Sequence, residues 1–326
     1  MHNIIYSLII PHRDCPKLLE RCLYSVPSRK DLEIIVVDDN STQNPIDFEK
    51  YPNLNRKDTT YIYEKSHKYA GNARNRGMAI AKGKWILFAD ADDFYNYSIN
   101  DILDEYRDDK SDIIFFKVNS LNSEDYSVSN RGNNRLNKFI DHYKEDPVKY
   151  GNLLKYQCGE PWSKLIKKKV IDENKIQFEA IVINGDHRFA YQLGFCSKYI
   201  KVDNRALYCA TSLPYSASKN RSDEAILTRI RVFTEAELFF KKNNLPSYIY
   251  WDLHYELLAT LYYENRRLFK EACNMLQKMG FTSKLLNLNI ACHDFHYSWK
   301  PILYAKSIRN KIIKKTSWKI LYRTYI

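Results

Sequence analysis

The chain has 326 residues, 44% of them hydrophobic, and a formal net charge of +12 at pH 7. This length fits one large domain or two ordinary ones. The low counts of glycine and proline, 9 and 10, exclude a fibrous or low-complexity protein. Seven cysteines without a C-x-x-C pair argue against a disulfide framework or a zinc site and favour reduced thiols in the cytosol. We expect no signal peptide and no membrane-spanning helix, because no apolar stretch reaches about 18 residues.

The first part of the chain alternates strand-like and helix-like runs. Continuous apolar runs predict buried strands at 4–10, 33–37, 61–63, 85–88 and 112–118. Helical spacing predicts helices over 18–26 and 70–82, which Pro27 and Gly83 would end. Strands that are apolar throughout, with helices between them, indicate an α/β fold with a mainly parallel sheet that helices cover on both faces.

The second part of the chain carries weaker signals. We expect a polar loop over 121–135, a basic helix over 150–174 and a last strand over 199–207. From about residue 222 to 279 the pattern is helical, with no comparable strand candidate. The sequence therefore predicts a catalytic domain over 1–220 and a helical C-terminal region over 221–326.

Polar segments follow three of the predicted strands. They are Pro11–Asp14, Asp38–Thr42 and Asp90–Asp93. In a parallel sheet, ligands bind beyond the carboxyl ends of the strands, and those ends lie at one edge. We therefore expect the three segments to form one site.

Asp90 and Asp92 form a D-x-D pair directly after a buried strand. Two carboxylates there can bind a divalent metal, and Mg²⁺ and Mn²⁺ favour carboxylate, water and phosphate oxygens. A metal with a diphosphate would explain why acidic residues cluster in a basic chain. The alternative is a solvated turn or a helix N-cap, because Asp is common in both.

Other candidate residues have an equally plain alternative when each is taken singly. Asp39 could accept a hydrogen bond from a nucleobase or cap the following turn. Arg74 and Arg76 could face a phosphate or lie on a solvated helix face. Asp186 could act as a general base toward a hydroxyl group or cap a helix.

The combination of motifs is more specific than its parts. S-L-I-I-P-H-R-D, then E-I-I-V-V-D-D-N-S-T, then A-R-N-R-G-M-A-I-A-K-G-K-W-I-L-F-A-D-A-D-D occur in this order. In order and spacing they resemble the family-2 glycosyltransferases with the GT-A fold, of the bacterial polysaccharide, capsule or lipo-oligosaccharide type. The resemblance continues more weakly through P-W-S-K-L-I-K-K and N-G-D-H-R-F to about residue 219.

The resemblance implies an inverting transferase that moves a hexose or N-acetylhexosamine from a UDP-sugar to a hydroxyl of a glycan or lipid-linked saccharide. By match of motif, Pro11, Arg13 and Arg74 would lie beside the nucleotide of the donor, and Asp39 would contact its uracil. Asp90 would contact the ribose or the sugar, and Asp92 would bind a Mn²⁺ or Mg²⁺ ion. On the acceptor side, Asp186 would be the base, and Trp162 and Lys164 match the family's Trp-x-Lys.

Four departures from the family pattern bear on these roles. His12-Arg13 stands where Tyr-Asn is usual, and Gln43 follows Thr42 in place of Asp. His67-Lys68-Tyr69 replaces Asn-x-Gly ahead of Ala-Arg-Asn, which alters the donor loop. Gly185 stands where the Glu of a Glu-Asp pair is common. The last two departures keep open a catalytically inactive, nucleotide-binding scaffold of the same fold.

The C-terminal segment is strongly basic. Residues 295–326 hold eight Lys and Arg and no Asp or Glu, and apolar residues recur among them at helical spacing. This pattern is typical of an interfacial helix on an anionic membrane, and residues 300–326 would then hold a cytoplasmic enzyme at the inner face of the cell membrane. The alternative is a helix packed on the protein with a solvated basic face. A nucleic-acid-binding protein is the competing class, but acidic strand ends would repel a phosphate backbone.

Overall fold

The structure is a computed structural model that describes residues 3–129, 133–213, 219–250 and 253–280. It divides into two compact units, residues 1–219 and a second unit from residue 220 onward. The strands of the first unit are β1 (Tyr6–His12), β2 (Leu32–Asp38), β3 (Thr59–Tyr63), β4 (Trp85–Phe88), β5 (Phe94–Tyr95), β6 (Ile113–Asn122), β7 (Lys164–Lys167) and β8 (Ile200–Ser212). Its helices are α1 (Pro16–Tyr24), the 3₁₀ helix η1 (Pro52–Leu54), α2 (Tyr69–Ile80), α3 (Ile99–Tyr106), α4 (Asn133–Asp141), α5 (Pro147–Gln157), α6 (Lys168–Glu173) and α7 (Asp186–Cys196).

The eight strands form one mixed sheet in the order β3-β2-β1-β4-β7-β6-β8-β5. The pairs β1/β2, β2/β3, β1/β4 and β6/β8 are parallel, while β7 and β5 pair antiparallel with their neighbours. From β1 the chain builds outward to β3 and then crosses back to add β4 on the other side of β1. The sheet therefore has a topological switch point between β1 and β4, where ligands bind in open α/β sheets.

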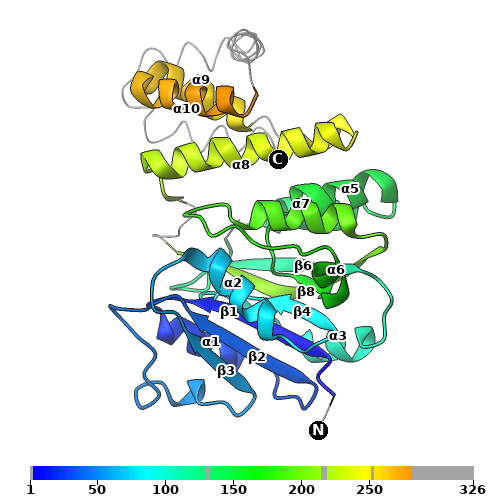
Figure 1. The fold of residues 1–326 in the computed structure, drawn as a ribbon. Helices are drawn as coiled ribbons and strands as arrows, with labels where there is room; N and C mark the ends of the chain where they lie inside the picture. Colours follow the sequence, from blue (N-terminus) through cyan, green and yellow to red (C-terminus); the bar gives the residue numbers. More distant parts are fainter. Residues whose placement is uncertain (1–2, 130–132, 214–218, 251–252, 281–326) are drawn as a thin grey trace. The chain divides into compact units, whose positions relative to one another are not determined.

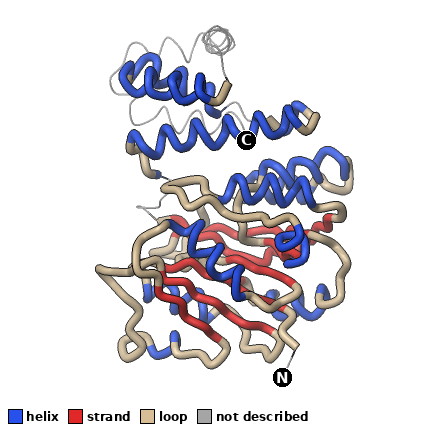
Figure 2. Tube along the Cα trace, in the orientation of Figure 1, coloured by secondary structure: helices blue, strands red, loops and turns tan. Residues whose placement is uncertain are grey.

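Helices cover both faces of this sheet (Figure 1). Because crossovers between parallel strands are right-handed, a chain that reverses its direction across the sheet places successive helices on opposite faces. Thus α1, between β1 and β2, and α2, between β3 and β4, lie on opposite sides (Figures 1 and 2). The predicted fold class of a mainly parallel sheet between helices is confirmed.

The first strand runs two residues farther than the sequence indicated and includes Pro11. The carbonyl of Ile9 accepts the N–H of Ala89, so the polar groups of Ile9 face the β4 side. Pro11, two residues on, faces the same side, and β4 has ended at the level of Ile9. The missing N–H of proline therefore removes no hydrogen bond of the sheet.

Gly83 is not the end of a helix, as the sequence suggested. The helix α2 ends at Ile80, and Ala81 is its C-cap residue. A Cβ atom on Gly83 would lie 2.6 Å from the backbone nitrogen of Ser7 on β1. Glycine is required here because two stretches of backbone approach each other closely.

The predicted helix over 150–174 is wrong in its middle part. The helix α5 ends at Gln157, and the chain then passes through Gly159 and Pro161, which disfavour a helix. It continues as β7, whose central residues Leu165 and Ile166 are fully buried between β4 and β6. A short apolar run between lysines fits an interior strand as well as a helix turn, so periodicity alone could not distinguish the two.

The second unit is helical, as predicted for this stretch. It contains α8 (Asp223–Lys242), the 3₁₀ helix η3 (Ser247–Ile249), α9 (Leu253–Glu264) and α10 (Arg266–Lys278). Their shared core is formed by Ile230, Leu257, Leu258, Leu261, Leu268, Ala272 and Leu276. None of the helices in the described part of the chain combines the length and apolarity that crossing a bilayer requires. The basic segment 300–326 lies outside the described residues.

Candidate functional site

The predicted meeting of the polar segments occurs at the carboxyl edge of β1, β2 and β4. Ile9 is level with Phe88, the last residue of β4, while β1 and β2 continue side by side to His12 and Asp38. The backbone N–H of Asp39 donates to the His12 carbonyl at 2.8 Å. The segments after β1 and β2 are thus hydrogen-bonded to each other at the switch point of the sheet.

Asp38 stabilises this edge of the sheet through hydrogen bonds of its buried side chain. Its carboxylate lies 2.7 Å from Nδ1 of His12 and accepts both the N–H and the hydroxyl of Ser41, at 2.7 and 2.6 Å. Although burial alone would raise the pKa of Asp38, the hydrogen bonds from His12 and Ser41 hold that pKa below its ordinary value. Asp38 is therefore committed to holding the loop.

Asp39, the residue expected at the nucleobase, is almost buried, with 4% of its side chain exposed. One carboxylate oxygen accepts the N–H of Lys68 at 2.7 Å, and the other lies 2.6 Å from Nδ1 of His67. These two donors come from the segment that departs from the family pattern. The sequence did not identify His67 as the partner of Asp39, because the two residues lie in different loops and only the fold brings them together.

Arg74 and Arg76 point in different directions although both lie on α2. Arg74 is buried, donates to the Asp90 carboxylate at 2.6 Å and has its guanidinium carbon 5.3 Å from the ring centre of Phe178. Arg76 is exposed and pairs with Glu64 at 2.8 Å. Of the two predicted alternatives, the structure brings Arg74 to the acidic turn and leaves Arg76 on the surface.

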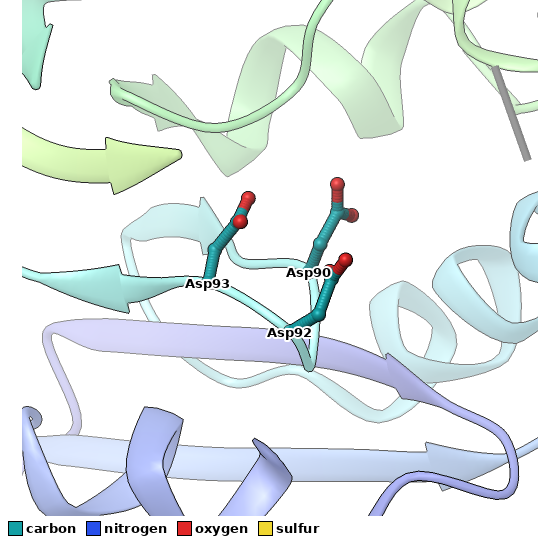
Figure 3. A group of neighbouring side chains, drawn as sticks. All are labelled: Asp90, Asp92 and Asp93. Carbon is teal, nitrogen blue, oxygen red and sulfur yellow. The ribbon is translucent and has the colours of Figure 1, made fainter. Parts of the chain in front are cut away.

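Three carboxylates share the turn after β4. One oxygen each of Asp90, Asp92 and Asp93 lies within 4.8 Å of the others. Figure 3 shows the three side chains pointing to the same side of the turn. Asp93 is fully buried, and its two oxygens accept the hydroxyl of Tyr208 at 2.9 Å and the N–H of Thr211 at 2.6 Å. Asp93 is therefore a structural residue that ties the turn to β8.

Asp90 and Asp92 remain as the pair that could hold a divalent cation. Both are partly exposed, in contrast to Asp93. Carboxylate oxygens this close together suit Mg²⁺ or Mn²⁺, which complete their coordination with water and phosphate oxygens. Asp90 also carries the ion pair with Arg74, so a cation bound at this turn would share the Asp90 carboxylate with that guanidinium.

Arg21 on α1 is a residue that sequence reasoning missed. Its guanidinium donates to the backbone carbonyl of Asp92, which also accepts the hydroxyl of Thr211 at 2.6 Å. The guanidinium carbon lies 5.3 Å from the ring centre of Phe94. Arg21 thereby holds the backbone of the acidic turn, and no motif in the sequence marks it.

Asp186 opens α7 and lies among charged groups of other segments. Burial raises its pKa, while nearby His187 and Arg74 act to lower that pKa and Glu160 acts to raise it. A carboxylate whose pKa is raised is a stronger base, which suits proton transfer from a hydroxyl. Arg74, which pairs with Asp90, is thus among the groups whose charge acts on Asp186.

The loop that leads to Asp186 is fixed against α2. Asn75 bonds both backbone groups of Phe178, accepting its N–H at 2.9 Å and donating to its carbonyl at 2.9 Å. Phe178 stacks on Phe189 of α7 with ring centres 3.9 Å apart. A Cβ atom on Gly71 would lie 2.0 Å from the Glu179 carbonyl, so this contact requires glycine. The helix α2 and the segment that leads to Asp186 are therefore packed against each other.

The remaining predicted residues lie in differing environments. Pro11 is buried in β1, whereas Arg13 has an exposed side chain 3.6 Å from Asp14. Trp162 is buried and stacks on Tyr208 with ring centres 5.3 Å apart. Lys164 is buried, and its ammonium group donates to the carbonyls of Cys158 and Glu160. Trp162 thus packs against β8, and Lys164 holds the backbone of the segment between α5 and β7.

Comparison with known proteins identifies relatives of this chain. The protein family described as "Glycosyl transferase family 2" matches residues 7–173 of this chain. The poly(ribitol-phosphate) beta-N-acetylglucosaminyltransferase TarP of Staphylococcus aureus is 28% identical over 186 residues, which are 53% of this chain and 52% of TarP. The poly(ribitol-phosphate) beta-glucosyltransferase of Bacillus spizizenii is 28% identical over 192 residues, 53% of this chain and 26% of that protein. The chain therefore spans about a quarter to a half of the length of these two relatives.

Solved structures with the same fold include transferases with bound donors. S. aureus TarS 1–349 in complex with UDP-GlcNAc aligns with a TM-score of 0.61 at 19% identity, over 82% of this chain and 79% of that one. The mannosyltransferase PcManGT from Pyrobaculum calidifontis, in complex with GDP-Man and Mn²⁺, aligns with a TM-score of 0.50 at 15% identity, over 92% of this chain and 82% of that one. Likenesses at this identity concern the fold, and they agree with the sheet described above.

Proposed function

We propose that this chain, which belongs to glycosyl transferase family 2, is an inverting glycosyltransferase that uses a UDP-sugar. It would move a hexose or N-acetylhexosamine to a hydroxyl of a glycan or lipid-linked saccharide in surface polysaccharide biosynthesis. The observation that carries the proposal is the gathering of Asp39, the Arg74–Asp90 pair and Asp92 at the switch point between β1 and β4. Family membership makes the chain a glycosyltransferase; the donor, the acceptor and the residue roles are what we propose.

The nucleotide would bind at the ends of β1 and β2. Asp39 would accept the imide N–H of uracil, and Pro11 and Arg13 would lie beside the nucleotide. Asp39 is suited to this role because Lys68 and His67 already fix its orientation, while each carboxylate oxygen can accept more than one hydrogen bond. A preoriented acceptor loses little entropy when the base binds.

The diphosphate and the sugar would lie over the turn after β4. Asp92, with Asp90 beside it, would hold a Mn²⁺ or Mg²⁺ ion, and such an ion stabilises negative charge that develops on a leaving diphosphate. Arg74 would add a fixed positive charge at the same place, and Asp90 would contact the ribose or the sugar. Because the Arg74 guanidinium is buried and already paired, its charge needs no rearrangement when the donor binds.

Transfer would then be a single displacement. The acceptor oxygen forms a bond to the anomeric carbon while the bond from that carbon to the diphosphate breaks, and the bonding electron pair leaves with UDP. Asp186 would take the proton of the acceptor hydroxyl as the new bond forms. One displacement inverts the anomeric centre, so an α-linked donor gives a β-glycoside.

The acceptor would bind on the side of Asp186, near Trp162 and Lys164. The names of the two relatives state poly(ribitol-phosphate), a polymer that contains phosphate groups. A net charge of +12 suits an anionic or lipid-linked acceptor of this kind. We therefore propose a glycan or lipid-linked saccharide with anionic groups as the acceptor class.

For the basic segment we propose peripheral attachment to the inner face of the cell membrane. The proposal depends on the sequence of residues 300–326, in which lysine and arginine alternate with aromatic and aliphatic residues. Flotation with anionic vesicles would compare the full chain with a version ending at residue 298. Equal flotation of the two would exclude a role for this segment.

An inactive nucleotide-binding scaffold is the second candidate. It is favoured by the close pairing of His67 with Asp39 and by the glycine at position 185. The experiment that separates the two is a screen of UDP- and GDP-sugars with Mn²⁺ for release of nucleoside diphosphate and for thermal stabilisation. An active transferase releases UDP from one or more UDP-sugars, whereas a scaffold is stabilised by UDP but releases none.

A further inference from the structure

The position before Asp186 is glycine because no side chain fits there. A Cβ atom on Gly185 would lie 2.4 Å from the backbone carbonyl oxygen of Glu179. The two segments are also hydrogen-bonded, since the Glu179 N–H donates to the Gly185 carbonyl at 2.9 Å. The family resemblance places a glutamate at this position. In this chain the fold excludes a carboxylate side chain there.

Glu160 brings a carboxylate to the same region from another part of the chain. It lies between α5 and β7, directly after Gly159, whose Cβ position is 3.5 Å from Nε2 of His187. His187 is the residue that follows Asp186 on α7. The segment of Glu160 is therefore packed against the start of α7, although it is distant from Asp186 in sequence.

Among the described residues, one oxygen of the Glu160 carboxylate has a hydrogen-bond partner and the other has none. Its Oε1 lies 3.2 Å from a guanidinium nitrogen of Arg135 on α4, and 26% of the Glu160 side chain is exposed. Its Oε2 is buried and has no hydrogen-bond partner among the described residues. Lys164 does not neutralise this carboxylate by a hydrogen bond; it donates to the backbone carbonyls of Cys158 and Glu160 and so fixes where Glu160 stands.

The charged groups that influence Asp186 come from four segments. They are His187 on α7, Arg74 on α2, Glu160 before β7 and Lys164 on β7, with Arg135 on α4 acting on His187 and pairing with Glu160. Burial lowers the pKa of His187, which favours its neutral form. Glu160 thus adds a negative charge near Asp186, opposite in sign to Arg74.

We propose that Glu160 is a positioning residue that supplies the carboxylate excluded at position 185 and acts through Asp186 to keep this base strong. The inference rests on the proposed transferase function, in which Asp186 takes the acceptor's proton. A nearby like charge disfavours the ionised form of a carboxylate and so increases its affinity for a proton. Without Glu160, the positive charge of Arg74 would leave Asp186 a weaker base.

The test uses the full chain and water as the acceptor, so that no acceptor has to be identified. Hydrolysis of a UDP-sugar with Mn²⁺ would be followed as a function of pH for wild type and Glu160→Gln. We expect the acid limb of kcat/KM to move to lower pH by about one unit, with a lower plateau rate, because Asp186 loses a proton more easily. Glu160→Asp keeps the negative charge, so the acid limb of its kcat/KM profile should lie at the same pH as that of the wild type.

Two further variants serve as an opposite charge change and as a control. Arg135→Gln removes the cation beside Glu160 and should move the acid limb to higher pH, opposite to Glu160→Gln. Glu235→Gln is the matched control, since Glu235 on α8 pairs with Arg231 at 2.8 Å and its side chain is similarly exposed, at 31%. It should leave the profile unchanged.

The outcomes separate this inference from the function on which it rests. An active wild type whose acid limb is the same in Glu160→Gln overturns the role of Glu160 alone. A wild type that binds UDP but hydrolyses no UDP-sugar overturns the transferase function and, with it, this inference.

Discussion

The hydroxyl of Tyr208 joins Asp93 to the backbone of Asp90. It donates to the Asp93 carboxylate at 2.9 Å and accepts the N–H of Asp90 at 2.9 Å. The N–H of Thr211 donates to the other oxygen of Asp93 at 2.6 Å. The turn with the candidate metal ligands is therefore held by β8, a strand from a distant part of the chain.

This relationship predicts that Asp93 contributes to stability. Asp93→Ala would leave a buried hydroxyl and a buried N–H without an acceptor, and should lower the free energy of unfolding by about 2–4 kcal/mol. Urea denaturation monitored by circular dichroism would measure the loss. Asp108→Ala is the control, because the Asp108 side chain is 93% exposed and its removal should change stability by less than about 0.5 kcal/mol. Equal losses in the two variants would contradict the structural role of Asp93.

The contact between Gly185 and Glu179 predicts a sharp dependence on side-chain size. In Gly185→Ala the new methyl group would meet the Glu179 carbonyl at 2.4 Å, so the loop ahead of Asp186 must shift. We expect a lower melting temperature and at least a tenfold loss of transfer, because small displacements of catalytic groups are costly. Gly159→Ala, whose methyl group would make ordinary contact with His187 at 3.5 Å, should keep the melting temperature of the wild type.

Replacement of the proposed base separates chemistry from binding. Asp186→Asn should lower transfer or hydrolysis by about 10²–10⁴-fold, the usual contribution of a general base, and leave UDP affinity unchanged. Turnover at the wild-type rate would remove Asp186 from this role.

The pH profile of the wild type provides a second test of Asp186. Burial raises its pKa above the ordinary value of 3.8, and only the ionised form can accept a proton. Activity should therefore fall as the pH falls through a value above 3.8, and the affinity for UDP should not follow this limb. If the affinity for UDP falls over the same pH range as the activity, the titrating group lies on the donor side and is not Asp186.

Asp39 is expected to discriminate the nucleobase and not the diphosphate. Asp39→Ala should weaken UDP binding about tenfold or more, because the imide N–H loses its charged acceptor. Binding of inorganic pyrophosphate with Mn²⁺ should stay as in the wild type. If both ligands weaken equally, Asp39 acts by supporting the loop through Lys68 and His67.

The sequence was sufficient for the parts of the fold and site that depend on local pattern. Buried strands read as apolar runs, and the order of strands and helices implied a mainly parallel sheet with its polar segments at one edge. The sequence was insufficient where the same stretch fits more than one kind of secondary structure. The stretch of Leu165 and Ile166 resembled part of a helix, and β8 was expected to end at residue 207, short of the Tyr208 and Thr211 that hold Asp93.

The contacts that sequence reasoning missed share a physical cause. Arg21, His67 and Glu160 act on Asp92, Asp39 and Asp186 from segments that lie elsewhere in the chain. Such contacts depend on how the sheet is ordered and how loops pack, and neither follows from residue spacing. The role of Asp93 was likewise hidden, because its partners become visible only when β8 lies beside the acidic turn.

We propose that a UDP-sugar binds at the switch point of the sheet with a divalent cation at Asp92. Isothermal titration calorimetry of UDP into the wild-type chain and into Asp92→Ala, each with and without Mn²⁺, tests it most directly. We expect Mn²⁺ to strengthen UDP binding to the wild type by tenfold or more and to have no effect on binding to Asp92→Ala. The same Mn²⁺-dependent affinity in both proteins would contradict the assignment of Asp92 and, with it, the proposed donor site.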